Sequence, residues 1–287
     1  MVLAWKLGKN STLAFLSPGA KLNFICKLTI AWSLTLHAIT IHRSMTDKIF
    51  EITYASYPIH YSFNYPATRY QFRDYIRKSN ALTYDIRADE DLLARARNFL
   101  PENSTDSYVE YRALIGLTGK ELLKYDCCIL HAVSFVYKGF VWLLSAPSGT
   151  GKTTQYRNWC RLFPEEIKMI SGDMPVLENQ DGKIYVYPTS WNGKENIGNK
   201  ISGPLGGVVY LSQDDENIIK DLSVKEGVPL FMKQFMGLPD NEREIRSLFG
   251  ILDGMFSNYP VWVYHNRGDD ESTLRLRDKI NEFLEGE

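Results

Sequence analysis

A short glycine-containing segment constrains the fold of this chain more than any other part of its sequence. Residues 146–154 read Ala-Pro-Ser-Gly-Thr-Gly-Lys-Thr-Thr. They follow an apolar run, Phe140–Ser145, that predicts a buried strand, and they precede residues 155–162, which predict a helix ended by Pro164. A strand, a glycine loop and a helix N-terminus are the parts of a phosphate-binding loop. The sequence therefore predicts an α/β protein built around an anion site.

The residue types of this loop indicate how it would hold phosphate. Small residues and glycines let consecutive backbone N–H groups face one anion, and the first turn of a helix adds unpaired donors and a partial positive charge. We expect Lys152 to reach the β- and γ-phosphates of ATP and the Thr153 hydroxyl to hold Mg²⁺. Ala146 stands where the usual pattern has its first glycine, and alanine adopts a positive φ only at a cost. The predicted nucleotide-binding residues are Ser148, Gly149, Thr150, Gly151, Lys152, Thr153 and Thr154.

Composition narrows the class of protein. A hydrophobic content of 44% and a charged content of 23% are typical of a globular chain, and 287 residues suffice for one or two domains. The formal net charge of −1 gives no electrostatic reason to expect a nucleic-acid partner. The four cysteines form no Cys-x-x-Cys pair, so they have neither zinc nor redox spacing. This cysteine usage suits a reducing compartment, and we expect a cytoplasmic protein.

Residues 1–44 differ from the rest of the chain. Phe24–Ile41 is rich in apolar and β-branched residues but contains Lys27 and His37. Because a charge near the centre of a membrane span costs roughly 2.5–3.5 kcal/mol, an anchor is disfavoured but stays open. We favour a peripheral or even non-native extension, with Met45 resembling a true start. We therefore expect no membrane association, except through residues 1–44.

A small N-terminal α/β portion is expected over residues 45–124. Its first strands are rich in Tyr and Ile, with Pro58 at an edge or turn, and Asp106 is a reasonable N-cap for its longer helix. The expected elements are one or two antiparallel strands over residues 49–63, a strand over 81–86, and helices over 88–100 and 107–124.

The remaining residues, 125–287, are expected to form the nucleotide-binding domain. One long buried strand is predicted over residues 127–137, and Lys138–Gly139 is expected to turn the chain into the strand that precedes the loop. The later strands are expected over residues 167–170, 174–177, 183–187, 207–212 and 260–265, and the helices over 224–236, 242–256 and 271–284.

Two side chains outside the loop are candidates for chemistry. A phosphate loop does not define a reaction by itself, because a second acidic group must hold the metal or activate a nucleophile. Asp173 follows the predicted strand over residues 167–170, and carboxylates at the carboxyl end of a strand face the ligand crevice of α/β proteins. A simple turn or N-cap aspartate is the alternative. His131 shares a strand face with Ile129 and Val133, which favours a buried histidine of the core.

A polar loop over residues 188–200 is the remaining candidate for substrate contact. It carries Trp191, Lys194 and Glu195, and polar loops beside a nucleotide site often touch substrate. A solvated surface loop is the alternative. The acidic runs at residues 214–216 and 269–271 are interpreted as a solvated turn and as a helix N-terminus.

The chain from His131 through the loop at residues 146–153 to Ser171-Gly172-Asp173 resembles the catalytic domain of HPr kinase/phosphorylase. That family belongs with the phosphoenolpyruvate carboxykinases to one branch of phosphate-loop proteins, and the string Ser-Gly-Thr-Gly-Lys-Thr-Thr is similar to the carboxykinase loop. The matching span covers about residues 125–215. The resemblance implies a phosphate-loop mixed sheet flanked by helices, and it makes a homo-oligomer an expectation.

The resemblance also implies roles for individual residues. Lys152 would bind phosphates, Thr153 would help to hold Mg²⁺, Asp173 would be an acid or base beside the metal, and His131 would lie near the transferred phosphate. The bifunctional kinases usually carry two consecutive aspartates, whereas here Gly172 precedes Asp173, which puts phosphorylase activity in doubt.

The N-terminal portion does not resemble the domain that precedes the kinase domain in those enzymes. The chain resembles instead the shorter HPr kinase-related proteins found beside peptide-modification genes, some of which phosphorylate a hydroxyl on a precursor peptide. We therefore expect an ATP- and Mg²⁺-dependent kinase acting on a serine-type hydroxyl of a peptide or small protein, with Asp173 or His131 as the base. A nucleotide-binding accessory protein without transfer and a carboxykinase-like enzyme are the alternatives.

Overall fold

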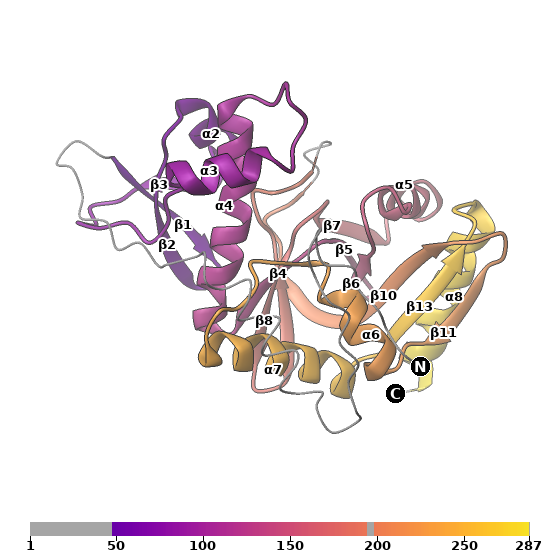
Figure 1. Ribbon diagram of the computed structural model, residues 1–287. Coiled ribbons are helices and arrows are strands. Elements are labelled where there is room, and N and C mark those ends of the chain that lie inside the picture. The colour runs from indigo at the N-terminus through magenta and orange to yellow at the C-terminus, as the bar shows by residue number, and fades with distance from the viewer. Residues whose placement is uncertain (1–47, 194–197, 287) are drawn as a thin grey trace, which may run out of the picture. The chain divides into compact units, whose positions relative to one another are not determined.

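The computed structural model describes residues 48–193 and 198–286, which lie within one compact unit spanning residues 40–287 (Figure 1). The expectations for residues 1–44 therefore fall outside the described residues. Within the described part, no helix combines the length and the apolar character that crossing a membrane requires. The unit is a mixed α/β structure with a small antiparallel sheet and a large mixed sheet.

The small sheet consists of β1 (Ile49–Tyr54), β2 (Tyr57–Ser62) and β3 (Ile76–Lys78) in the order β2-β1-β3. Pro58 lies in the edge strand β2, as expected for a residue that cannot donate to a ladder. The strand expected over residues 81–86 is wrong, because only Ile86 forms an isolated bridge there. The backbone N–H groups of Asp85 and Ile86 donate to His60 O, and Ser62 N donates to Ile86 O, so the segment meets β2 through a single parallel bridge and not a ladder.

Three helices accompany this sheet: α2 (Pro66–Gln71), α3 (Glu90–Arg97) and α4 (Asp106–Leu122). The predicted N-cap of α4 is off by one residue. The Thr105 hydroxyl accepts from Tyr108 N at 3.3 Å, whereas Asp106 is the first helical residue and its carboxylate pairs with Arg97. Helix α2 was not predicted from the sequence. Its proline at the first helical position is the signal that could have found it.

The large sheet has the strand order β12-β4-β8-β9-β10-β6-β5-β7, with β13 paired to β10 and β11 to β13. Its strands are β4 (Cys127–Leu130), β5 (Ala132–Tyr137), β6 (Phe140–Ser145), β7 (Ile167–Ser171), β8 (Val176–Gln180), β9 (Lys183–Tyr187), β10 (Gly203–Gln213), β11 (Ile218–Asp221), β12 (Phe235–Met236) and β13 (Val261–Asn266).

The single long strand expected over residues 127–137 is wrong in one respect, because it breaks at His131. Strand β4 before the break pairs with β8 and β12, whereas β5 after it pairs with β6 and β7. His131 lies between the two strands, so the alternation of side chains between the two faces of a strand is interrupted there. His131 is therefore half-buried and does not share the buried face of Ile129. The Lys138–Gly139 turn is confirmed, with φ values of 49° and 85° that fit a tight hairpin.

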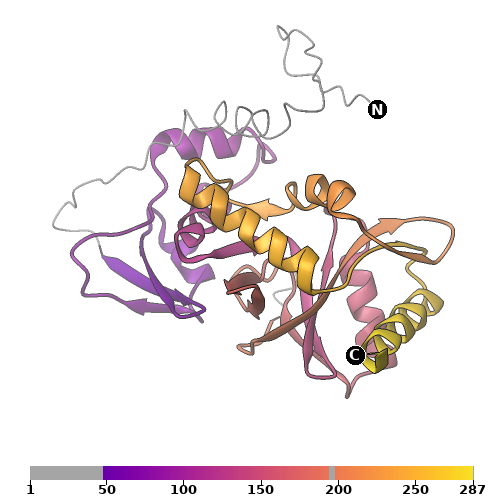
Figure 2. The same ribbon diagram turned by 90° about the horizontal axis from the view of Figure 1, so that it is seen from below.

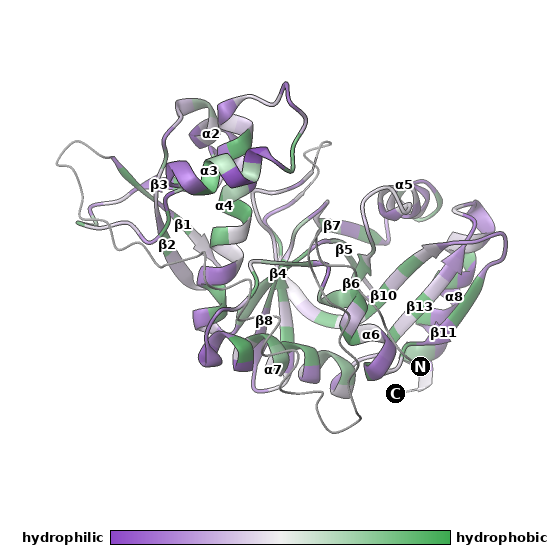
Figure 3. Cartoon of the chain, viewed as in Figure 1, coloured by the Kyte–Doolittle hydropathy of each residue, from purple (hydrophilic) through white to green (hydrophobic). Residues whose placement is uncertain are grey.

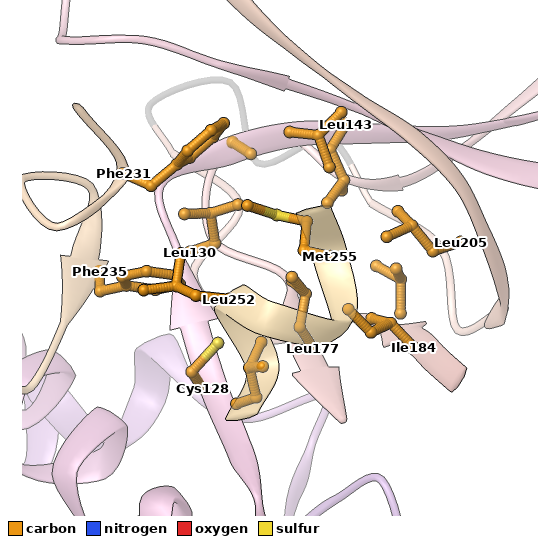
Figure 4. Packing of buried hydrophobic residues seen from close by; sticks show 14 of the residues in the cluster. Cys128, Leu130, Leu143, Leu177, Ile184, Leu205, Phe231, Phe235, Leu252 and Met255 are labelled. Carbon is orange, nitrogen blue, oxygen red and sulfur yellow. The ribbon is translucent and has the colours of Figure 1, made fainter. Parts of the chain in front are cut away.

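Helices cover both faces of the large sheet. Helices α5 (Lys152–Leu162) and α8 (Asp270–Gly286) pack on one face against residues such as Trp142 and Leu144. Helix α7 (Glu242–Asn258) lies across the other face, where Leu252 and Met255 contact Leu143 and its neighbours (Figures 2 and 4). Hydrophobic residues run along the strands, whereas the helices alternate apolar and polar faces (Figure 3).

The helix expected over residues 224–236 is shorter than predicted. Helix α6 (Val224–Phe231) ends early because Phe235–Met236 form β12, which pairs with β4. A third core packs α4 and the small sheet against residues that include Met174, Val176 and Trp191. The N-terminal portion and the phosphate-loop portion therefore share buried contacts, and their boundary near residue 124 stays a prediction.

Candidate active site

The strand directions explain why distant candidates meet at one edge of the large sheet. Strand β5 is antiparallel to both β6 and β7, so β6 and β7 run parallel and end on the same side. The phosphate loop follows β6 and Asp173 follows β7, while His131 immediately precedes the antiparallel β5. The loop, Asp173 and His131 are thereby brought together at the carboxyl ends of the parallel strands, where α/β proteins bind ligands.

The loop between β6 and α5 has the backbone that its glycines suggest. Gly149 and Gly151 adopt positive φ values of 84° and 103°, and a Cβ added at either would meet nothing within 4 Å. Gly151 is the residue that precedes α5, and its carbonyl accepts the first helical bond from Gln155 N at 2.9 Å. Ala146 is buried and does not take a positive φ, so the replacement of the usual first glycine costs no backbone strain here.

Lys152, the first residue of α5, folds back over the loop. Its Nζ donates to Ala146 O at 2.7 Å and to Pro147 O at 3.1 Å, and the residue is only 7% exposed. Burial lowers the pKa of Lys152 to about 8, and the nearby Asp173 carboxylate offsets part of that effect. An incoming phosphate would replace the two carbonyls as the partner of this ammonium.

His131 and Asp173 form a direct pair. His131 Nε2 lies 3.2 Å from Asp173 Oδ1, and His131 Nδ1 lies 3.0 Å from the Oε1 atom of Gln234. Gln234 is buried at 3% exposure, and its backbone carbonyl also accepts from His131 N at 2.8 Å. The imidazole is thus held from both ring nitrogens, which fixes its orientation. Nothing in the sequence pointed to Gln234, because the contact joins residues 103 positions apart in the chain.

Local bonds place Asp173 after its strand. The Ser171 hydroxyl accepts from Met174 N at 3.3 Å, which forms a tight turn of the kind serine favours. The carbonyl of Asp173 accepts from Ala132 N at 2.8 Å, which ties this turn to the start of β5. The Asp173 side chain is 24% exposed and its partner His131 is 16% exposed. The carboxylate is therefore partly shielded while one side stays open to a ligand.

Gly193 packs directly against this carboxylate. It adopts a φ of 69°, and a Cβ added there would lie 3.2 Å from Asp173 Cβ. A side chain at this position would both strain the backbone and press on Asp173. The glycine therefore belongs to the site although it offers no functional group.

A cleft of about 930 Å³ contains the candidate residues. His131 and Asp173 line it together with most of the predicted loop residues, whereas Thr150 does not. The predicted residues that line the cleft are His131, Ser148, Gly149, Gly151, Lys152, Thr153, Thr154, Asp173 and Trp191.

Trp191 lines the cleft but is only 1% exposed. Its ring stacks 5.9 Å from the ring of Tyr54 and packs edge-on against Phe72 at 5.3 Å. This position favours packing of the wall over stacking on a ligand, and its predicted substrate contact stays a prediction. The predictions for Lys194 and Glu195 fall outside the described residues.

The opposite wall of the cleft comes from α2 and α4 and was not predicted. Tyr111 and Arg112 of α4 line it, as does Arg73 just after α2. Burial and the Asp173 carboxylate raise the pKa of Tyr111, so its hydroxyl stays a hydrogen-bond donor across the neutral range. No sequence signal marked this wall, because its contribution depends on how the N-terminal portion packs.

The donor set fits a magnesium ion that comes with a nucleotide. Within residues 48–193 and 198–286, no three His, Cys, Asp or Glu side chains gather in a way that could hold a metal. Mg²⁺ in phosphoryl-transfer sites is commonly held by one or two protein groups plus substrate phosphates. The Thr153 hydroxyl and the Asp173 carboxylate, which line one cleft, suit that arrangement.

Comparisons with known proteins give likenesses to solved structures only. No protein-family model and no curated protein sequence matches the chain. Among solved structures, it is similar to the Hpr(Ser) kinase/phosphatase from Coxiella burnetii, with a TM-score of 0.32 and 12% sequence identity. The alignment covers 55% of this chain and 93% of that chain. A likeness at this level carries no argument about activity, so the site is assigned from its own contacts.

Proposed function

We propose that this chain is an ATP- and Mg²⁺-dependent kinase that phosphorylates a serine-type hydroxyl on a peptide or small protein. The observation that carries the proposal is the placement of the His131–Asp173 pair in the same cleft as the phosphate loop. A loop alone would support nucleotide binding only. A carboxylate held beside it adds a group that can accept a proton from an attacking hydroxyl.

The proposed transfer balances without a further reactant. The acceptor oxygen forms a bond to the γ-phosphorus, the bond from that phosphorus to the β–γ bridging oxygen breaks, and ADP leaves. Asp173 takes the hydroxyl proton. We assign this role to Asp173 because both ring nitrogens of His131 already have protein partners, whereas no described residue pairs with Asp173 Oδ2. His131 then orients the carboxylate.

The loop residues would stabilise charge. The ammonium of Lys152 and the N–H groups of the loop and first turn of α5 would neutralise the phosphate oxygens. Thr153 and Asp173 would hold Mg²⁺, which when bound shields the charge that develops on the transferred group. The loop and Thr153 lie at a strand end and a helix start, so among these groups Lys152 is the one that must exchange its partners, Ala146 O and Pro147 O, on binding.

The test is to incubate the protein with γ-labelled ATP and serine peptides, including those encoded by neighbouring genes. Mass spectrometry then shows whether the label has been transferred to a peptide. We expect transfer by the unaltered protein and none by Lys152→Ala. The matched control is Lys225→Ala, which removes an exposed lysine at the start of α6 and should keep full activity. Undiminished transfer by Lys152→Ala would refute the proposal.

A nucleotide-binding accessory protein without transfer is the second candidate. One observation favours it: among the described residues that line the cleft, Asp173 is the only carboxylate. Calorimetric titration with ATP combined with a phosphate-release assay separates the two candidates. Binding of ATP without transfer to any serine peptide would favour the accessory role.

A further inference from the structure

The cleft wall formed by α4 is a continuous stripe on one helix face. Thr105, Tyr108, Tyr111, Arg112 and Ile115 line the cleft. Their successive spacings of three, three, one and three residues place them on one side of an α-helix, at its N-terminal half. Through these residues the helix lines the same cleft as the phosphate loop, while Ile115 also packs in the core shared with the small sheet. The helix therefore presents an ordered surface to whatever shares the cleft with the nucleotide.

The charge on this wall is positive. Arg112 is exposed, and no described carboxylate forms an ion pair with it. Arg73 contacts only its neighbours, with its guanidinium over the Tyr70 ring at 4.5 Å and an Asp74 oxygen at 3.9 Å. Among the described lining residues, this wall contributes no carboxylate. A guanidinium without a partner in a cleft is a site for an anionic group, which it can bind through two parallel hydrogen bonds.

The position of the wall indicates which substrate the anion belongs to. The phosphate loop, on the other side, would hold the triphosphate, and the acceptor hydroxyl must reach Asp173 between the two walls. A cleft of about 930 Å³ is at the upper end of the roughly 300–1,000 Å³ typical of small-molecule sites, so it has room for an acceptor beside a nucleotide. The residues of α4 are thus available to the acceptor.

We propose that the acceptor is an acidic peptide, in which a carboxylate near the phosphorylated serine binds Arg112. The proposal rests on the proposed kinase function and specifies its substrate class. Tyr108 and Tyr111 supply flat, partly apolar surface beside the guanidinium, which suits an extended peptide backbone. Arg112 recognises the acceptor and takes no part in the transfer step.

The first experiment measures peptide binding without chemistry. Fluorescence anisotropy is recorded with a labelled serine peptide that carries Asp and Glu near the serine, in the presence of Mg²⁺ and a non-hydrolysable ATP analogue. The comparison peptide has Asn and Gln at the same positions. We expect the acidic peptide to bind about tenfold more tightly, the usual effect of one charge-assisted pair. Equal binding of the two peptides would overturn the proposal.

Variants then assign the preference to one side chain. Arg112→Gln should abolish the preference for the acidic peptide while leaving the affinity for the ATP analogue unchanged, and Arg112→Lys should keep part of it. Arg246→Gln is the matched control, because it removes an exposed arginine of α7 that pairs only with Glu242. An Arg112→Gln protein that keeps the preference, or that loses ATP-analogue affinity instead, contradicts the assignment.

A transfer assay on the same two peptides separates this inference from the proposed function. A lower KM for the acidic peptide, raised about tenfold by Arg112→Gln at unchanged kcat, supports both. Binding of the acidic peptide without transfer supports the acceptor site and refutes the kinase. Transfer to both peptides with equal KM supports the kinase and refutes the acidic acceptor.

Discussion

His131 Nε2 lies 3.2 Å from Asp173 Oδ1, and this contact joins the start of one strand to the turn that follows another. Strand β5 begins at Ala132 and pairs with β7, and Ala132 N donates to Asp173 O at 2.8 Å. The backbone register therefore fixes the side-chain pair. A carboxylate is held beside the loop that precedes α5 by the sheet itself, and the proposed transfer depends on this placement.

Replacing the carboxylate tests its role as the proton acceptor. Asp173→Asn keeps the shape of the side chain and removes its basicity, so we expect kcat to fall about 10²–10⁴-fold. Calorimetric titration in the absence of Mg²⁺ should show ATP affinity close to that of the unaltered protein, because the phosphate contacts are those of the loop. Unchanged kcat in the variant would exclude Asp173 as the base.

The lowered pKa of Lys152 predicts how ATP binding depends on pH. Phosphate binding favours the charged ammonium, so it raises the pKa of Lys152 above the free-state value of about 8. Affinity should therefore be constant from about pH 7, where the phosphates are ionised, to the free-state pKa, and should decline above it. Calorimetric titrations from about pH 7 to pH 9.5 measure the decline in ATP affinity. Lys152→Met should bind weakly with no decline, and a decline of equal size in that variant would contradict the assignment.

The lowered pKa of Lys152 should make the stability of the free protein rise with pH, whereas it makes ATP affinity fall. The pKa is lower in the folded protein than the usual 10.5, so the unfolded chain binds more protons between about pH 8 and 10.5. This single group therefore makes the free energy of unfolding rise with pH in that window. Urea unfolding of the unaltered protein and of Lys152→Met isolates the contribution, and identical pH slopes would show that the lysine is not buried as described.

Gly193→Ala should damage the site without touching a functional group. The methyl group would lie 3.2 Å from Asp173 Cβ on a backbone with a φ of 69°. We expect a kcat reduction of about tenfold or more, since small displacements of a catalytic group are costly, while ATP affinity stays unchanged. Gly139→Ala has the same positive-φ strain but meets nothing within 4 Å, so it controls for strain alone. Equal kcat in the two variants would argue against a positioning role for Gly193.

Gln234 should act through His131. Gln234→Leu leaves His131 Nδ1 without its partner, which frees the imidazole to turn away from Asp173. We expect a reduction of about tenfold in kcat at unchanged peptide KM, and partial recovery in Gln234→Glu, which keeps an acceptor oxygen. Steady-state kinetics of the two variants provide the comparison. A loss of the same size in both would indicate a packing role only.

Gln155 should be important for the attachment of the loop helix. It is fully buried, its Nε2 donates to Asn266 Oδ1 at 3.2 Å and to Ser272 Oγ at 2.5 Å, and Thr273 Oγ1 donates to its Oε1 at 3.1 Å. Gln155→Leu leaves these buried partners unsatisfied and should cost about 1–3 kcal/mol of unfolding free energy. Urea denaturation measures the change, and Arg246→Gln, on the surface, should stay within about 0.5 kcal/mol.

Local features of the fold could be predicted from the sequence. The loop, the Lys138–Gly139 turn and helix α5, which begins three residues earlier than the predicted 155, depend on residues within a few positions of one another, so their glycines, apolar runs and helix signals are sufficient. Two errors about strands share one origin. The strand expected over residues 81–86 and the unbroken strand over 127–137 had suitable composition, but strand identity depends on a distant partner that composition does not name.

The sequence by itself determined a glycine loop between a strand and a helix and a carboxylate in the turn after another strand, because the loop needs only its own short backbone and the aspartate only its turn. The tertiary structure decided that Asp173 meets His131, that Gln234 holds that histidine, and that Arg112 faces the loop across a cleft. These contacts follow from strand order and from the packing of α4. Both are set by burial of apolar surface between segments far apart in the chain, and no local pattern encodes that outcome.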